Sequence, residues 1–257
     1  MLNVEWLKPK HLVILLLIII VNVALFGQIP QKQTLIASGH PQWAPIMSQS
    51  GDKIVGAGPE LAQKIFAEMG IETDSQYVGA WDTVQAKARA GEIDVIVAAY
   101  KTEEREAYMD FSDAYVEDPI AVFVSKQNIF SYKEWSNLIG KRGVATIGDS
   151  YGQALDAYME KELTVVRVDT PDQAFKMLQD GQADYFLYSL YAGQGVIKSL
   201  AYEGTIEYMP EYAATENFYI AISKKSPFAD RMPEVNQLLK KYEEDGTIDA
   251  LVKKYQD

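Results

Sequence analysis

The chain has 257 residues, of which 48% are apolar and 23% are charged, so a fibrous or wholly disordered protein is excluded. At about 100–200 residues per domain, this length predicts one large domain or two smaller lobes. The formal charge is −12, from 36 acidic and 24 basic side chains. This balance argues against nucleic acid as a partner, because phosphate binding needs a basic surface.

Cysteine and histidine usage narrows the chemistry further. The sequence has no cysteine, which excludes disulfides, thiolate nucleophiles and cysteine-ligated metal sites. Two histidines, His11 and His40, are too few for a histidine metal cluster, and His11 lies beside an apolar run. The sequence therefore predicts neither a metal ion nor a cofactor.

Residues 1–30 are predicted to direct export. Lys8 and Lys10 precede an apolar run over residues 12–26. A helix of that length spans about 22 Å, which is short of the roughly 30 Å hydrocarbon core of a bilayer. A basic start before a short apolar run is typical of a secretory signal peptide, and an uncleaved membrane anchor through residues 12–26 is the alternative. Either segment places the rest of the chain in the periplasm or another extracytoplasmic space.

Beyond residue 30, short apolar runs alternate with helical patterns. Strands are expected over residues 35–38, 72–78, 93–98, 120–124, 143–147, 164–168, 184–187 and 218–223. Helices are expected over residues 59–70, 83–90, 151–161, 170–179, 232–244 and 248–255. This alternation predicts an α/β fold with mostly parallel strand pairing.

Five short motifs follow one another along the chain. They are the aromatic turn at residues 40–45, the helix entry at 56–61, the run Gly91-Glu92-Ile93-Asp94-Val95-Ile96 with Thr102-Glu103-Glu104-Arg105 and Asp110-Phe111-Ser112 behind it, Gly140–Val144 with Gly148-Asp149-Ser150-Tyr151, and Gly181-Gln182-Ala183-Asp184-Tyr185. In this order, over about residues 34–254, the chain resembles the bacterial extracellular solute-binding proteins of polar amino-acid ABC transporters (family 3, periplasmic binding protein type II fold).

The resemblance implies two α/β lobes joined by two crossover hinge strands that close on a small solute. The first lobe would comprise residues 34–120 plus 215–257, and the second lobe residues 121–214. The resemblance also implies a monomeric receptor that captures a small carboxylate-bearing solute, an amino acid or a related organic anion, and delivers it to the membrane permease of an ABC transporter. A ligand sensor or degenerate receptor for a membrane signalling partner is the alternative, and a dehydratase-like enzyme on the same fold has a weaker case.

Arg105 is the first candidate for the ligand site. Its guanidinium offers a planar fork of donors that matches a carboxylate, and the resemblance assigns this role to the arginine of the Thr102–Arg105 motif. The other interpretation is an exposed arginine that pairs weakly with Glu103 and Glu104. Ser150, at a predicted helix start, would add a hydroxyl and nearby amide N–H groups to the same carboxylate, unless it is an ordinary helix cap.

Three aromatic residues, Trp43, Trp81 and Tyr100, occur where the family places cleft aromatics or their neighbours. Such rings exclude water and hold an apolar or cationic ligand group, although any single aromatic residue is more often part of the core.

Ser189 marks a departure from the family. Relatives that bind amino acids commonly carry an aspartate there, which accepts hydrogen bonds from the ligand's ammonium group. The segment before Arg105 is also one residue shorter than usual and carries Lys101. Carboxylate recognition is therefore expected to be retained and ammonium recognition altered, with Glu60 and Asp82 as compensating acids unless they simply lie on the surface.

Overall fold

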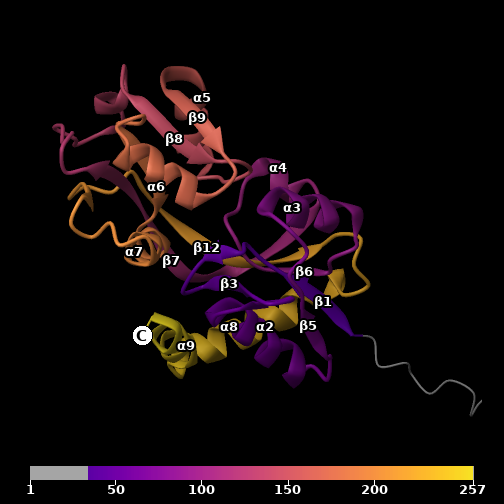
Figure 1. The fold of residues 1–257 in the computed structure, drawn as a ribbon. Helices are drawn as coiled ribbons and strands as arrows, with labels where there is room; N and C mark the ends of the chain where they lie inside the picture. Colours follow the sequence, from indigo (N-terminus) through magenta and orange to yellow (C-terminus); the bar gives the residue numbers. More distant parts are fainter. Residues whose placement is uncertain (1–33, 257) are drawn as a thin grey trace, which may run out of the picture. The chain divides into compact units, whose positions relative to one another are not determined.

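A nine-stranded mixed sheet runs through residues 34–256, the part of the chain that this computed structural model describes (Figure 1). Its strands follow the order β5-β1-β6-β12-β7-β10-β8-β9, and β11 pairs with β7 off this path. In chain order they are β1 (Leu35–Ser38), β5 (Thr73–Ser75), β6 (Val95–Ala99), β7 (Met109–Ser125), β8 (Arg142–Thr146), β9 (Thr164–Val168), β10 (Tyr185–Ser189), β11 (Ile206–Tyr208) and β12 (Ala214–Ser223). The predicted signal peptide or anchor, residues 1–30, lies outside the described residues.

The helices flank this sheet, and a second, three-stranded antiparallel sheet lies beside it. The helices are α2 (Ala57–Glu68), α3 (Trp81–Ala90), α4 (Glu103–Glu106), α5 (Gln153–Glu162), α6 (Pro171–Gln179), α7 (Leu190–Ser199), α8 (Met232–Glu244) and α9 (Thr247–Gln256), with 3₁₀ turns η1 (Trp135–Leu138) and η2 (Ala229–Arg231). The small sheet has the order β2 (Gln42–Trp43), β3 (Met47–Ser50) and β4 (Lys53–Val55). Within residues 34–256, no helix has the length and hydropathy needed to cross a membrane.

Strands β7 and β12 join two lobes. They pair antiparallel from Ala214 opposite Ile120 to Ser223 opposite Met109. On one side of this pair lie β6, β1 and β5 with α2, α3 and α8, and on the other side lie β10, β8 and β9 with α5, α6 and α7 (Figure 1). This is the two-lobed arrangement with two crossover strands that the resemblance implies, and the residues at which the lobes divide remain a prediction.

The expected mostly parallel pairing is wrong for the sheet as a whole. Four of the pairings in the main sheet are parallel and four are antiparallel, and every antiparallel pairing includes β7 or β12. Since the chain leaves one lobe along β7 and returns beside it along β12, these two strands must run in opposite directions. Parallel pairing therefore holds only among the outer strands of each lobe.

Each lobe has its own apolar packing against the sheet. In the first lobe, Leu61, Ile65 and Phe66 bury one face of α2, as their spacing predicts. In the second lobe, the rings of Phe123 and Phe175 meet edge to face with centroids 5.2 Å apart. Such packing keeps the loops at the inner ends of the strands in fixed positions where the lobes meet.

Candidate functional site

A narrow crevice lies where the two lobes meet. Its lining includes Trp43, Trp81, Tyr100, Arg105 and Ser150, and the cavity that remains is about 20 Å³. A cavity of roughly 10–15 Å³ is the smallest that holds one water molecule, so side chains fill most of this space. Five of the seven predicted site residues thus meet at one place.

An open groove of about 780 Å³ adjoins the crevice and shares Arg105, Asp149 and Ser150 with it. Thr102, a sixth predicted site residue, lines this groove. The volume lies within the roughly 300–1,000 Å³ that is usual for small-molecule sites. The groove therefore gives a solute a path to Arg105 from solvent.

Arg105 is held by the segment around it. Thr102 caps the short helix α4 and accepts a hydrogen bond from the amide of Arg105 at 3.3 Å. This turn directs the side chain inward, so that the residue is only 5% exposed. Burial lowers the pKa of the Arg105 guanidinium, and nearby acidic groups, Asp149 among them, oppose that shift.

The guanidinium of Arg105 bonds only neutral acceptors among the described residues. Nε donates to Gln85 at 3.1 Å, Nη1 to the carbonyl of Tyr100 at 2.9 Å and Nη2 to the carbonyl of Gly148 at 3.5 Å. An arginine has five N–H donors, so two more can serve a ligand. The alternative of an exposed arginine paired with its neighbours does not hold, since Glu104 pairs with Arg89 at 2.7 Å.

The predicted aromatic residues form one connected wall. The Trp43 ring lies 5.9 Å from that of Tyr100 and 4.7 Å from that of Tyr188. Trp81 starts α3, and the Arg105 guanidinium lies 5.3 Å from the centre of its ring. Trp43, Trp81 and Tyr100 are buried and line the crevice at the same time, so the core and cleft interpretations describe one arrangement.

Asp118 is a central residue that the sequence did not reveal. It lies on β7, is 1% exposed, and accepts hydrogen bonds from Trp43 Nε1 at 2.8 Å, Tyr100 OH at 2.5 Å and Ser189 Oγ at 2.7 Å. Burial raises the pKa of Asp118, and the three donors oppose the shift. The one available signal was a charged residue directly before the apolar run that starts at Pro119.

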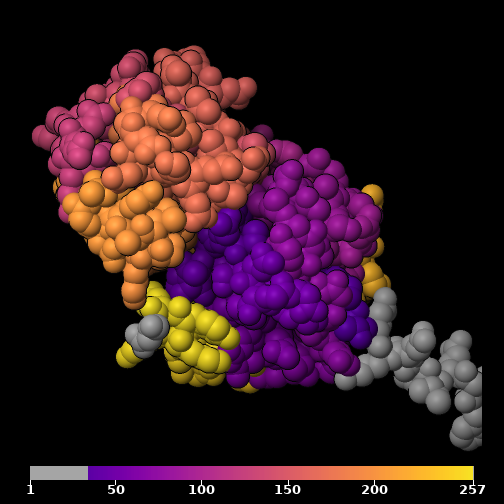
Figure 2. Space-filling model, in the orientation of Figure 1, coloured from indigo at the N-terminus to yellow at the C-terminus, as the bar shows by residue number. Residues whose placement is uncertain are grey.

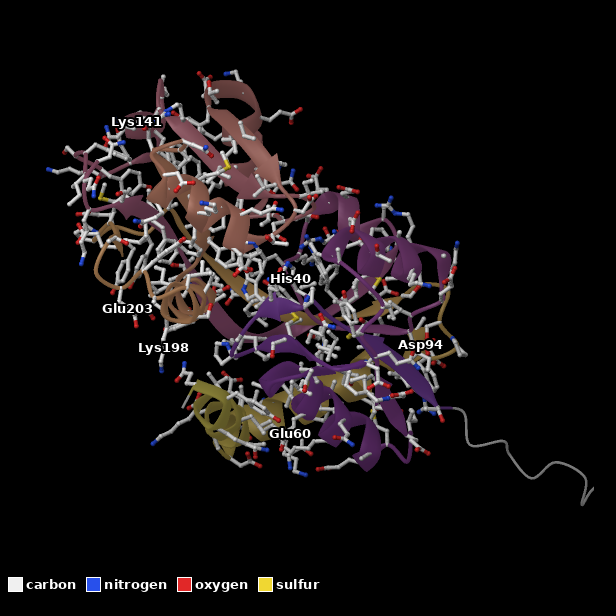
Figure 3. The ribbon with its side chains drawn as sticks, viewed as in Figure 1. His40, Glu60, Asp94, Lys141, Lys198 and Glu203 are labelled. Carbon is white, nitrogen blue, oxygen red and sulfur yellow. The ribbon has the colours of Figure 1, made fainter. Side chains whose placement is uncertain are left out.

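Ser189, the seventh predicted residue, lines neither cavity. It caps α7 by accepting from the Ala192 amide at 3.4 Å, and it donates to Asp118, which also accepts from the crevice residues Trp43 and Tyr100. The two compensating acids considered from the sequence also lie elsewhere. Glu60, which is labelled in Figure 3, pairs with Lys254 of α9 at 2.5 Å. Asp82 accepts a hydrogen bond from the amide of the next residue, Thr83.

The segment around Ser150 differs from the expected helix start. Helix α5 begins at Gln153, not near residue 151, because Asp156 bonds back to the preceding turn. Its carboxylate accepts from Ser150 Oγ and from the Tyr151 amide, the latter at 2.8 Å, and Ser150 Oγ accepts from the Gly152 amide at 3.2 Å. In this conformation, the Ser150 hydroxyl and the Tyr151 amide, which were expected to face an anionic ligand, donate to the chain's own Asp156.

Direct side-chain contacts link the two lobes beside the crevice. His40, labelled near the centre of Figure 3, has its Nε2 atom 3.2 Å from Asp149 Oδ1. Since His40 Nδ1 accepts from the amide of Gln42 at 3.0 Å, the imidazole proton is on Nε2 and faces the carboxylate. Gln42 also donates to Asp172 at 3.0 Å, and Tyr188 OH donates to the Gln42 carbonyl at 2.5 Å. On the face shown in Figure 2, the orange surface of the second lobe abuts the indigo surface of the first.

Comparison with known proteins places the chain in a family. The model of the bacterial extracellular solute-binding proteins, family 3, matches residues 35–257. The chain belongs to this family. The L-cystine-binding protein TcyJ of Escherichia coli is 25% identical over 236 residues, which cover 90% of this chain and 85% of that protein. Family and relative are binding proteins, so the sequence-based prediction of a binding protein, not an enzyme, is confirmed.

Two solved structures agree with the fold. The amino acid ABC transporter substrate-binding protein AbpA of Streptococcus pneumoniae, bound to L-arginine, has a TM-score of 0.74 at 22% identity and covers 89% of this chain and 96% of its own. A histidine kinase sensor domain with similarity to periplasmic binding proteins has a TM-score of 0.76 at 19% identity and covers 88% and 96%. The periplasmic-binding-protein type II fold is therefore confirmed, and a periplasmic or extracytoplasmic location follows from the family.

Proposed function

We propose that this protein is a monomeric solute receptor that takes up a small carboxylate-bearing solute between its lobes and delivers it to the permease of an ABC transporter. The buried guanidinium of Arg105 is the main support. It lacks a carboxylate partner among the described residues, keeps two N–H donors for a ligand and lies at the inner end of an open groove. A buried charge without a counter-ion is costly, and an anionic ligand supplies the missing charge.

The crevice must widen for this role. Its cavity of about 20 Å³ is too small for an amino acid, so the solute enters along the groove while the lobes rotate apart about β7 and β12. Trp43, Trp81 and Tyr100 then form the wall against which the solute packs. Thr102 and Ser150 line the groove beside it, and Ser150 binds the carboxylate by exchanging its hydrogen bond to Asp156 for one to the solute. The second-lobe position of Ser150 lets one solute contact both lobes.

A thermal-unfolding screen tests the proposal. The purified full chain is heated with L-amino acids, amines and simple organic acids, each at millimolar concentration. A receptor ligand at a hundred times its Kd stabilises the folded state by about 2.7 kcal/mol, so a narrow class of carboxylates should raise the midpoint. No shift with any carboxylate, or equal shifts with amines that lack a carboxylate, contradicts the proposal.

A sensor that signals through a membrane partner is the second candidate. The contacts His40–Asp149, Gln42–Asp172 and Tyr188–Gln42 hold the lobes together through the chain's own side chains. A domain whose crevice closes in this way can transmit a change in lobe angle without releasing cargo. Transport predicts that the bound solute dissociates when a cognate permease is added in membranes, whereas sensing predicts that the solute stays bound while the partner's output changes.

A further inference from the structure

Strand β9 forms an open edge of the main sheet, beside β8 (Figure 1). Among the described residues it pairs with β8 alone, in parallel register from Thr164 opposite Arg142 to Val168 opposite Thr146. Every residue of β9 is exposed or half-buried. An edge strand of this kind can accept a further strand on its free side.

Two residues of β9 carry backbone groups that the sheet does not use. The amide of Ile147 donates to the carbonyl of Val168 at 2.9 Å, so Val168 and every second residue before it direct their backbone groups to β8. The N–H and C=O groups of Val165 and Arg167 therefore point away from β8. Among the described residues, no hydrogen bond engages these four groups. They are free to pair with an extended chain beside β9.

The open groove runs along this edge. Leu163, Val165 and Arg167 line it, so the residues with free backbone groups border the space that is open to a ligand. At about 3.3 Å per residue, the stretch from Leu163 to Arg167 is about 13 Å long. Three residues of an extended chain span about 10 Å. The groove thus has the length and the backbone groups to hold a short extended peptide.

Arg105 lies beside the C-terminal end of this edge. Its Nη2 donates to the carbonyl of Gly148 at 3.5 Å, and the preceding residue, Ile147, bonds Val168 at the end of β9. A peptide that runs parallel to β9 therefore brings its C-terminal carboxylate toward the guanidinium. Because Arg105 is only 5% exposed, the narrow end of a peptide reaches it, whereas the surface of a second folded protein does not.

We propose that the solutes of this receptor are short peptides, which add a parallel strand to the open edge of β9 and place their C-terminal carboxylate against Arg105. This inference rests on the proposed receptor function. Carbonyls of the peptide accept from the amides of Val165 and Arg167, and its N–H groups donate to their carbonyls, as in the ladder between β8 and β9. Since these bonds use only backbone atoms, they recognise an extended chain and not a particular side chain.

Calorimetric titration of the purified full chain with trialanine tests this mode of binding. The comparison probes are L-alanine and a trialanine analogue with both peptide nitrogens methylated, which keeps the side chains and the charged ends but has no peptide N–H donor. Trialanine should bind about ten- to a hundred-fold more tightly than L-alanine, because it adds two or three backbone hydrogen bonds. The methylated analogue should bind about three- to ten-fold more weakly than trialanine for the hydrogen bond that it loses.

Val165→Pro tests the edge from the side of the protein. Proline removes the outward N–H group and is tolerated on a free sheet edge, because that group takes no part in the ladder with β8. Trialanine should then bind about three- to ten-fold more weakly, while L-alanine binds as before. Val166→Thr is the matched control, since Val166 is 54% exposed, lies outside the groove lining and directs its backbone groups to β8. It should leave the affinity for trialanine unchanged.

The outcomes separate this inference from the proposed function. Equal affinity of the wild-type protein for trialanine and L-alanine, no binding of trialanine, or equal affinity for the methylated analogue overturns the peptide class and leaves the carboxylate receptor to the thermal screen. Equal binding of trialaninamide, which lacks the carboxylate, contradicts the role of Arg105 and leaves the pairing with β9 standing.

Two further results are decisive for the edge itself. If Val165→Pro does not fold, the methylated analogue decides with the wild-type protein. Sedimentation velocity examines the other possible occupant of the edge, a second copy of this chain. A wild-type dimer that Val165→Pro dissociates, together with unchanged affinity for trialanine, assigns the edge to self-association and overturns the inference.

Discussion

Tyr100→Phe is the most informative perturbation of the crevice. The substitution keeps the ring that lines the cavity and removes only the hydroxyl that donates to Asp118 at 2.5 Å. A hydrogen bond to a charged group contributes about 1.5–3 kcal/mol, so the free energy of unfolding should fall by that amount. Tyr188→Phe is the matched control, since Tyr188 is equally buried but its hydroxyl donates to a neutral carbonyl, that of Gln42. Its cost should be about 0.5–1.5 kcal/mol.

Urea unfolding at neutral pH measures both costs. The same Tyr100→Phe change is then made in an Asp118→Asn background, where the acceptor no longer carries a charge. The cost should fall there by about 1 kcal/mol, which is the coupling expected of two groups in direct contact. Equal costs for the two tyrosines, or no coupling between Tyr100 and Asp118, would refute the view that a charged Asp118 organises the crevice.

Two other predictions concern stability. Because burial raises the pKa of Asp118, the folded state binds its proton more tightly than the unfolded chain, so this group's contribution to stability declines as pH rises from about 4 through the raised value. Asp118→Asn should therefore lose less stability than the wild type over that range in urea unfolding, and parallel pH profiles would count against it. Gly56→Ala should cost about 2 kcal/mol more than Gly51→Ala, since both glycines have positive φ but only a Cβ at 56 would overlap backbone, the Ile46 carbonyl oxygen at 2.5 Å. Equal melting shifts in calorimetry would disprove the clash.

The sequence predicted the elements with strong local signals. Helix α8 and strand β9 have the expected bounds, and α6 follows Thr170, whose side chain caps it. Helix α7 was not predicted because it contains two glycines, which disfavour helices. One of them, Gly193, lies where the helix packs directly on the Phe123 ring. Tertiary packing therefore stabilises a helix that the local sequence propensity does not predict.

The candidate site was predicted as a set of residue types more than as a set of contacts. Arg105 and the aromatic wall carry motifs that are local in sequence, and the structure brings them together at the crevice. Asp118 has no such motif, because its partners Trp43 and Ser189 lie 75 and 71 residues away along the chain. Single-sequence patterns do not reveal contacts of that range. Only the fold shows that Ser189, where the resemblance leads one to expect an acid, lies next to Asp118 on β7.

The solute-binding role of Arg105 is the central claim, and calorimetry of Arg105→Gln tests it most directly. The titrant is the solute that raises the unfolding midpoint most in the thermal screen, and Arg142→Gln, which removes an exposed arginine paired with Asp184, is the control. We expect Arg105→Gln to weaken binding about ten- to a hundred-fold, the loss of roughly 1.5–3 kcal/mol for a charged hydrogen bond, and the control to bind like the wild type. Unchanged affinity in Arg105→Gln would contradict the claim.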